Sequence, residues 1–224
     1  IAIVAAPVTL VRDDAARTRV GALTLLGGWK LTSASRQFGG LSALAVHGRE
    51  LTAIGDAGSV LRFRLGNFGR PYAASIPHRV VFDRDPTDPA ARAARFAWQP
   101  PAGYNPTEIA ALPDGRWLML VRRIALDTLF TTQLLLIDPR TRVGRRLPNG
   151  RVLTRFEPPV IHDNFEGLSV TVESGRPIVW MISDNNFLDW QSTYLLKLAI
   201  DPAALAIRRP RPAPLRSSAS AAAP

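Results

Sequence analysis

The sequence predicts an all-β fold, and three observations support this prediction. Short apolar runs bounded by turn residues dominate the chain, whereas helix signals are few. A unit of two apolar strands, joined by a tight turn and followed by a polar corner, occurs three times. A third apolar run follows each copy, so each unit reads as an antiparallel meander. Because repeated meanders close most economically as a β-propeller, we expect a small or incomplete propeller of about 4–5 blades.

The three copies of the unit share the same order of strands and turns. They run from Gly39 to Asp56, from Thr107 to Arg122 and from Phe165 to Asp184. Their turns contain residues that favour hairpins and lie at 47–49, 113–115 and 173–176. The third apolar runs follow at 60–65, 132–137 and 193–199. This repetition predicts one supersecondary unit that is used several times.

The start of the chain allows two interpretations. Residues 1–6 are apolar and read either as a first strand or as the remainder of a signal peptide. A further apolar run at residues 20–26 leads into the first copy of the unit. The chain begins with Ile1 and not with Met, so we expect that a signal peptide has been removed or lies outside this chain.

Helices are expected in two places only. Asp88 as N-cap and Pro89 at the first helical position predict a short helix to about residue 95. Residues 202–207 predict one or two further helical turns. From Arg209 onward the chain is mostly Pro, Arg, Ser and Ala, with little to bury. We therefore expect a propeller domain at 1–200 and a disordered tail at 201–224.

Composition narrows the classes of function. The net charge of +10 invites a nucleic-acid interpretation, but only Lys30 and Lys197 among the 28 basic residues are lysine. The arginines are scattered and are not interleaved with aromatic residues, so we expect no nucleic-acid partner. No apolar run is long enough to span a membrane. The absence of cysteine excludes disulfides, thiolate metal sites and cysteine nucleophiles. We expect a monomer.

Acidic residues recur at the corners of the repeated unit. Glu108 and Glu166 each lie just before an apolar strand, at positions that we take as equivalent, with Gly39 there in the first copy. Asp56 and Asp184 close the second strands of their copies. If these four carboxylates converge, they could hold Ca²⁺, which favours several hard oxygen ligands and could activate water. The alternative is that each Glu accepts backbone N–H groups and only joins neighbouring blades.

The same corners carry further polar candidates. Arg122 and Arg123 stand where the other copies place an Asp, so they could grip a phosphate or pair with a neighbouring carboxylate. Asn185 lies in the most polar corner of the chain, and Asp163 and Asn164 could supply further oxygens. Turn capping by Asx residues explains this corner equally well. The candidate catalytic residues are Glu108, Glu166 and Asp184, and the candidate substrate-binding residues are Arg122, Arg123 and Asn185.

Known nucleophile motifs are missing from the sequence. The three histidines, His47, His78 and His162, show neither a triad order nor zinc spacing. No Gly-x-Ser-x-Gly elbow occurs, and Ser42 and Ser169, at strand positions that look equivalent, are interpreted as structural. A hydrolase built on this chain would therefore depend on its carboxylates.

Several strings in the chain resemble the family described as "esterase-like activity of phytase". They are Phe-Gly-Gly-Leu-Ser-Ala-Leu at 38–44, Asn-Pro-Thr-Glu-Ile at 105–109, Asn-Phe-Glu-Gly-Leu at 164–168 and Ser-Asp-Asn-Asn-Phe at 183–187. The resemblance extends from about Val20 to Ile200. Members of this family usually carry a further acidic motif between the first blade and the Asn-Pro-Thr-Glu blade. The corresponding interval here, residues 82–103, lacks it, so one blade is expected to be absent.

The resemblance implies a phytase-like β-propeller that hydrolyses ester or phosphoester bonds. It also implies an exported protein, periplasmic or secreted, that acts on a small ester or phosphate substrate, with Ca²⁺ as the candidate cofactor. The alternative is a non-catalytic propeller that binds a ligand or a protein partner, which the lack of a nucleophile and of one blade favours.

Overall fold

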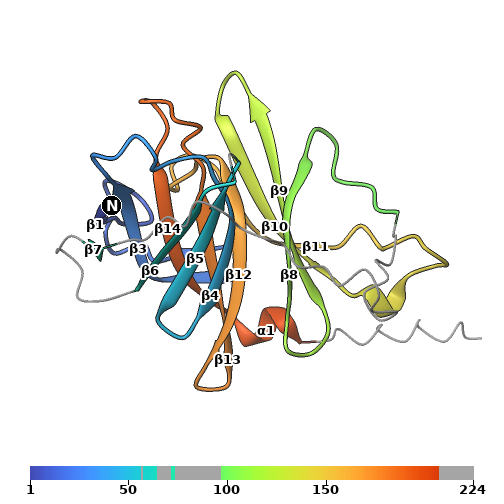
Figure 1. Ribbon diagram of the computed structural model, residues 1–224. Coiled ribbons are helices and arrows are strands. Elements are labelled where there is room, and N and C mark those ends of the chain that lie inside the picture. Colours follow the sequence, from blue (N-terminus) through green and yellow to red (C-terminus); the bar gives the residue numbers. More distant parts are fainter. Residues whose placement is uncertain (57, 65–71, 74–96, 207–224) are drawn as a thin grey trace, which may run out of the picture.

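A computed structural model describes residues 1–56, 58–64, 72–73 and 97–206 of the chain (Figure 1). These residues form three antiparallel sheets with very little helix, which confirms the all-β prediction. The strands are β1 (Ala2–Pro7), β2 (Arg19–Val20), β3 (Leu23–Thr32), β4 (Leu41–His47), β5 (Glu50–Gly55), β6 (Val60–Arg64), β7 (Tyr72–Ala73), β8 (Asn105–Ala111), β9 (Trp117–Ala125), β10 (Leu129–Ile137), β11 (Arg151–Phe156), β12 (Phe165–Glu173), β13 (Arg176–Ser183) and β14 (Thr193–Ile200).

Each predicted unit forms the expected meander. The first sheet has the order β4-β5-β6, the second has the order β11-β10-β9-β8, and β12, β13 and β14 are neighbours in the third. The turn between β12 and β13 places Ser174 and Gly175 at φ angles of 49° and 74°. Two consecutive positive φ values are typical of a hairpin turn whose twist matches the flanking strands. The strand β11 has no counterpart among the predicted runs.

The third sheet joins the two ends of the chain. Its order is β12-β13-β14-β3-β1-β7, so β3 from the N-terminal region pairs with β14 from the last unit. In Figure 1 the blue strands β1 and β3 accordingly lie beside the orange strand β14. Most of the segment 1–6 forms β1, which agrees with the strand interpretation of the start.

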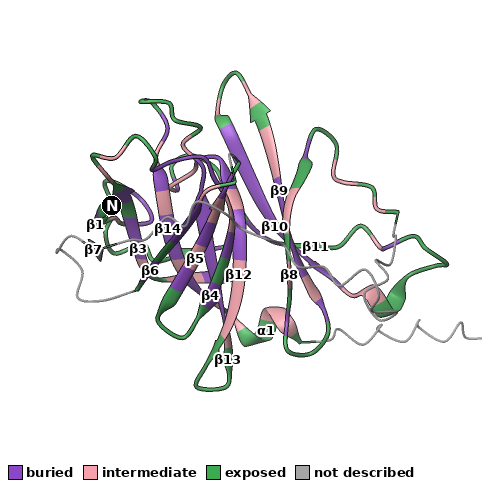
Figure 2. Cartoon of the chain, in the orientation of Figure 1, coloured by how far each residue is buried: buried purple, intermediate pink, exposed green. Residues whose placement is uncertain are grey.

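The third sheet is covered on both faces. One face packs against the second sheet through a core that includes Phe156, Phe165 and Leu196. The other face packs against the first sheet through a core that includes Trp29 and Trp180. Figure 2 shows buried residues concentrated along these strands and exposed residues at the hairpin turns.

The first strands of the three units are neighbours. Strand β12 packs against both β4 and β8, and Figure 1 shows it between them. The Val46 N–H donates to Ser169 Oγ at 3.1 Å, which links β4 to β12, and Thr107 Oγ1 donates to the Phe165 carbonyl at 3.4 Å, which links β8 to β12. Consecutive propeller blades pack in this manner. A closed ring stays a prediction, because residues 65–71 and 74–96 lie outside the described residues.

The C-terminal part of the described chain contains a short helix. The helix α1 (Pro202–Leu205) forms where helical turns were expected, with Asp201 as its N-cap. Ala204 and Leu205 pack against the core, so the first residues of the predicted tail belong to the folded part. The helix predicted at 88–95 and the tail from residue 207 lie outside the described residues. No helix in the described part of the chain is long and apolar enough to cross a membrane.

Candidate acidic metal site

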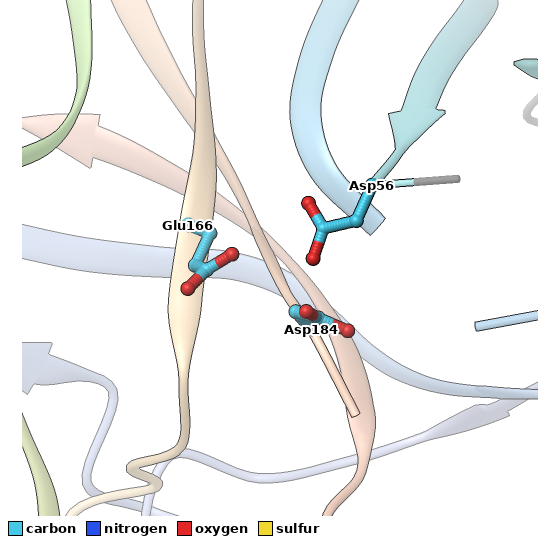
Figure 3. Close-up of side chains that lie close together, drawn as sticks. All are labelled: Asp56, Glu166 and Asp184. Atoms are coloured by element: carbon cyan, nitrogen blue, oxygen red, sulfur yellow. The ribbon is translucent and has the colours of Figure 1, made fainter. Parts of the chain in front are cut away.

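Three carboxyl groups converge at one edge of the sheets. Asp56 follows β5, Glu166 is the second residue of β12, and Asp184 follows β13. One oxygen from each lies within 4.8 Å of the others, and Figure 3 shows the three side chains pointing toward one another. Asp56 is exposed, Glu166 is half-buried and Asp184 is fully buried, so the group reaches from the interior to the surface.

The backbone places two of these residues by the same arrangement. The Asp184 N–H donates to the Asn164 carbonyl, and the Asp56 N–H donates to the Gly40 carbonyl, each at 2.9 Å. Each bond joins the end of a second strand to the residue before a first strand. Asp56 and Asp184 are therefore equivalent, as the sequence predicted, and Arg122 holds the corresponding position in the second sheet.

Glu108 and Glu166 are not equivalent, contrary to the prediction. A β-bulge near the start of each first strand leaves one residue without a partner in the ladder. That residue is Glu166 in β12, Ser42 in β4 and Thr107 in β8, so neither Glu108 nor Gly39 matches Glu166. Glu108 is the first residue after the bulge and matches Gly167 in β12 and Ala43 in β4, one ladder position beyond Glu166. A shared residue type does not fix the alignment of two strands to within one position.

The same register separates Ser42 from Ser169. Ser42 matches Glu166 in the ladder, whereas Ser169 matches Ala45. The Gly-Leu-Ser strings that suggested the equivalence therefore sit three residues apart in the two units. Both serines make structural hydrogen bonds in the described part of the protein, Ser42 to Asp56 and Ser169 to the Val46 N–H.

Glu108 stays outside the group of three. It pairs with Leu120 across the ladder and so lies on the face of β8 that covers the core. Its Oε1 accepts a hydrogen bond from the neighbouring Ile109 N–H at 3.0 Å. Burial raises the pKa of Glu108, and this hydrogen bond partly opposes the rise. Glu108 thus accepts from its own strand, whereas the alternative from the sequence had it join neighbouring blades.

Asp184 is the buried member of the group. Its Oδ1 accepts the Asn186 N–H at 2.7 Å, while its Oδ2 has no hydrogen-bond partner among the described residues. Burial raises the pKa of Asp184, and repulsion from Asp56 raises it further. A buried carboxylate oxygen without a donor is costly, and a cation would satisfy it.

Glu166 is held by an arginine. Arg122 Nη1 donates to Glu166 Oε1 at 2.5 Å and also to Asn164 Oδ1. Burial raises the pKa of Glu166, the Arg122 charge opposes this rise, and Asp184 and Asp56 add to it. The ion pair was one of the two interpretations of Arg122 from the sequence. Three carboxylates facing one guanidinium leave two negative charges uncompensated when all are ionised.

The other predicted substrate-binding residues have separate positions. Arg123 follows Arg122 in β9 and therefore points to the opposite face, where its guanidinium lies 5.6 Å from the centre of the Tyr104 ring. Asn185 Oδ1 accepts the N–H groups of Gly40 and Phe187, at 3.2 and 3.3 Å. Asn185 thus organises the corner next to the carboxylates, as the turn-capping alternative predicted.

The neighbouring polar segment has a structural role. Asp163 accepts the N–H groups of Asn164 and Ser192 through its two oxygens, at 2.7 and 3.0 Å, and it is not a member of the group of three. His162 Nδ1 lies 2.8 Å from the Val160 carbonyl. Because a carbonyl only accepts, this ring nitrogen carries the proton.

Aromatic side chains border the acidic group, and the sequence did not indicate this. Phe130 and Trp190 stack with their ring centres 6.3 Å apart, and the Arg122 guanidinium lies 5.8 Å from the centre of the Phe130 ring. Phe187 and Trp190 are 55% and 60% exposed. Two large aromatic residues directly after the polar corner at 183–186 are the signal that could have identified this border from the sequence.

The fold and this site define an all-β protein whose repeated meanders bring acidic side chains together where the strands end. A family model described as "Phytase-like: Esterase-like activity of phytase" matches residues 69–187, which is more than half of the chain. The chain therefore belongs to this phytase-like family. The matched span contains Glu166 and Asp184 and ends before β14, while Asp56 lies outside it. No curated protein and no solved structure shows significant similarity to the chain.

Proposed function

We propose that this protein is an exported hydrolase, periplasmic or secreted, that cleaves ester or phosphoester bonds with the help of Ca²⁺. Membership of the phytase-like family supports the hydrolase class. One observation carries the assignment of the site, namely the convergence of Asp56, Glu166 and Asp184 around a buried oxygen that lacks a partner. The enzyme would act as a monomer on a small molecule.

The ligand set suits a hard cation. Ca²⁺ binds oxygen ligands at about 2.3–2.6 Å, so ligands on opposite sides of the ion lie up to about 5 Å apart. The 4.8 Å limit on the three carboxylate oxygens fits this span. The exposed Asp56 leaves room on the solvent side for water and a substrate oxygen. Ser42, whose Oγ donates to Asp56 Oδ1 at 2.6 Å, holds that carboxylate in place.

Each carboxylate would have a distinct role in the proposed reaction. Asp184 would be the inner ligand, because it is buried and held by the Asn186 N–H. Glu166 would be the second ligand, and Arg122 would keep it ionised and oriented. A bound cation would supply Lewis-acid activation of the ester or phosphate group and of a water molecule. Glu108, whose carboxyl lies outside the group, takes no part in this assignment.

A second function is favoured by the aromatic border. Exposed Phe187 and Trp190 beside the acidic group offer a surface on which an apolar ligand or a partner could bind without any reaction. In that case the cation would hold the corner in shape, and no bond would be cleaved. The two functions agree on the cation and differ on catalysis.

Calcium titration followed by thermal melting tests the cation site. A specific site raises the melting temperature by mass action, and we expect Asp184→Asn to abolish the rise. Asp13→Asn, which removes an exposed carboxylate outside the site, is the matched control and should respond like the wild type. An equal response of both variants would contradict the site.

Hydrolysis assays separate the two functions. We expect calcium-dependent turnover of p-nitrophenyl acetate or p-nitrophenyl phosphate that is lost in Glu166→Gln. A calcium-dependent rise in melting temperature without turnover of either ester would favour the binding function.

A further inference from the structure

A second candidate site lies on the third sheet, away from the three carboxylates. A pocket of about 550 Å³ opens between β1, β3, the start of β14 and the segment 159–162. Arg12, Lys30, His162 and Tyr194 supply its polar lining, and Asp56, Glu166 and Asp184 do not contribute to it. Its volume falls within the range of about 300–1,000 Å³ that is typical of small-molecule sites.

Backbone pairing holds two walls of this pocket together. The Ile161 N–H donates to the Leu10 carbonyl at 2.7 Å, and Val11 forms a β-bridge with Val160. The segment after β1 is thus tied to the segment before β12. Leu10 and Val160 are buried, so this part of the wall belongs to the core. The pocket is therefore a feature of the folded sheets and does not depend on a loose loop.

The floor of the pocket places the Lys30 ammonium next to the Tyr194 phenol. Lys30 of β3 is the ladder partner of Tyr194 in β14, and it also pairs with Ala6 of β1. Directly paired residues of antiparallel strands point to the same face, so the ammonium and the phenol share one face of the sheet. A lysine ammonium supplies three hydrogen-bond donors and the phenol a fourth.

The charge in this pocket has one sign. Arg12 and Lys30 are both exposed, and neither forms an ion pair with any residue that the structure describes. The lining contains no aspartate or glutamate. The His162 Nδ1–H is used on the Val160 carbonyl, and its other ring nitrogen is not engaged by a described residue. Two unpaired cations in one pocket favour an anionic group.

We propose that this pocket binds a small organic anion. Arg12 and Lys30 would hold its carboxylate or phosphate group, with the Tyr194 hydroxyl as a further donor. Its apolar part would lie against Pro7, Val8 and Ile161, which line the same pocket. The inference stands on this pocket alone and holds whether or not the acidic site is catalytic.

Isothermal titration calorimetry with phenylphosphonate tests the proposal. Its carbon–phosphorus bond resists ester hydrolysis, and a chelator in the buffer keeps cations out of the acidic site. We expect one site per chain. Lys30→Ala and Arg12→Ala should each weaken binding by roughly tenfold, because each removes a charge-assisted hydrogen bond. Arg62→Ala, which removes an exposed arginine on β6, should bind like the wild type.

Three further probes define the ligand class. Benzoate should bind if a carboxylate is accepted, and its failure would restrict the class to phosphate-like groups. Benzyl alcohol, which has the ring without the charge, should bind at least tenfold more weakly than phenylphosphonate. Inorganic phosphate should also bind more weakly, because it lacks the apolar part. Equal binding of phenylphosphonate by the wild type and both pocket variants would overturn the proposal.

Discussion

Arg122 in β9 holds the ladder position that Asp184 holds directly after β13, although β9 itself continues to Ala125. From that position it donates to Glu166, so one guanidinium lies beside the group of three carboxylates where the three sheets meet. Because the second meander has an arginine at this position, no fourth carboxylate joins Asp56, Glu166 and Asp184 in the described part of the protein. The arginine also explains why Glu166 can be ionised in a half-buried setting.

Removal of Arg122 should destabilise the protein. Arg122→Ala leaves the half-buried Glu166 without its partner and Asn164 Oδ1 without its donor, and we expect a loss of about 1–3 kcal/mol in the free energy of unfolding. Urea denaturation measures this loss. Arg122→Lys retains the charge but lacks the planar guanidinium group. Its free energy of unfolding should lie between those of the wild type and Arg122→Ala. A loss no larger than that of Arg62→Ala would contradict the role of the pair.

Glu108 and Glu166 should differ in their response to calcium. Glu166→Gln removes a carboxylate from the group of three and should abolish the calcium-dependent rise in melting temperature. Glu108→Gln should leave the rise unchanged, since that carboxyl lies outside the group. Differential scanning fluorimetry with and without Ca²⁺ compares the two. Loss of the response in both variants would place Glu108 back among the ligands.

Asp184 should make the metal-free protein less stable as the pH rises. Burial raises the pKa of Asp184 above its ordinary value of 3.8, so its favourable contribution is complete below that value. The contribution is lost as the pH rises through the folded-state pKa. Asp184→Asn cannot ionise, and its amide could donate where Oδ2 now lacks a partner. Without metal, its melting temperature should exceed that of the wild type by about 2 °C or more at pH 7.

The control for this prediction is the same comparison at pH 3.5, where the carboxyl of Asp184 is protonated in the folded protein. The difference in melting temperature between Asp184→Asn and the wild type should be smaller at pH 3.5 than at pH 7. Addition of Ca²⁺ at pH 7 should reverse the order, because only the wild type gains from the ion. An advantage that does not depend on pH would indicate that ionisation is not its cause.

Gly167 should tolerate no side chain at the contact between β12 and β4. A Cβ there would lie 2.5 Å from Ile182 Cγ2 and 3.0 Å from the backbone of Ala43 and Leu44. Because backbone atoms cannot move aside cheaply, Gly167→Ala should cost about 1–3 kcal/mol in the free energy of unfolding. Gly48→Ala, at a turn where a Cβ would meet open space but φ is 59°, provides a comparison without a clash. Urea denaturation of both variants separates the clash from the strain of a positive φ.

Much of the local structure could be predicted from the sequence. Alternating apolar runs and turn residues determine a hairpin over a few residues, so the turns at 47–49, 113–115 and 173–176 and the third strands of all three units were predicted. The equivalence of Asp56, Asp184 and Arg122 followed from the same short-range pattern. Asp56 and Asp184 directly follow β5 and β13, whereas β9 continues past Arg122 to Ala125, so the sequence matched these residues but not the length of that strand.

The sites depended on contacts between distant segments, which a local pattern does not contain. The ladder register that separates Glu108 from Glu166 is set by strand pairing, and the pairing of β3 with β14 joins residues far apart in the chain. The Arg122–Glu166 pair and the pocket at Lys30 follow from that packing. Sequence alone therefore determined the meanders and their acidic corners, because hydrophobic periodicity and turn chemistry are local. Only the tertiary structure decided which corners meet, because burial of the sheet faces sets the register and the neighbours.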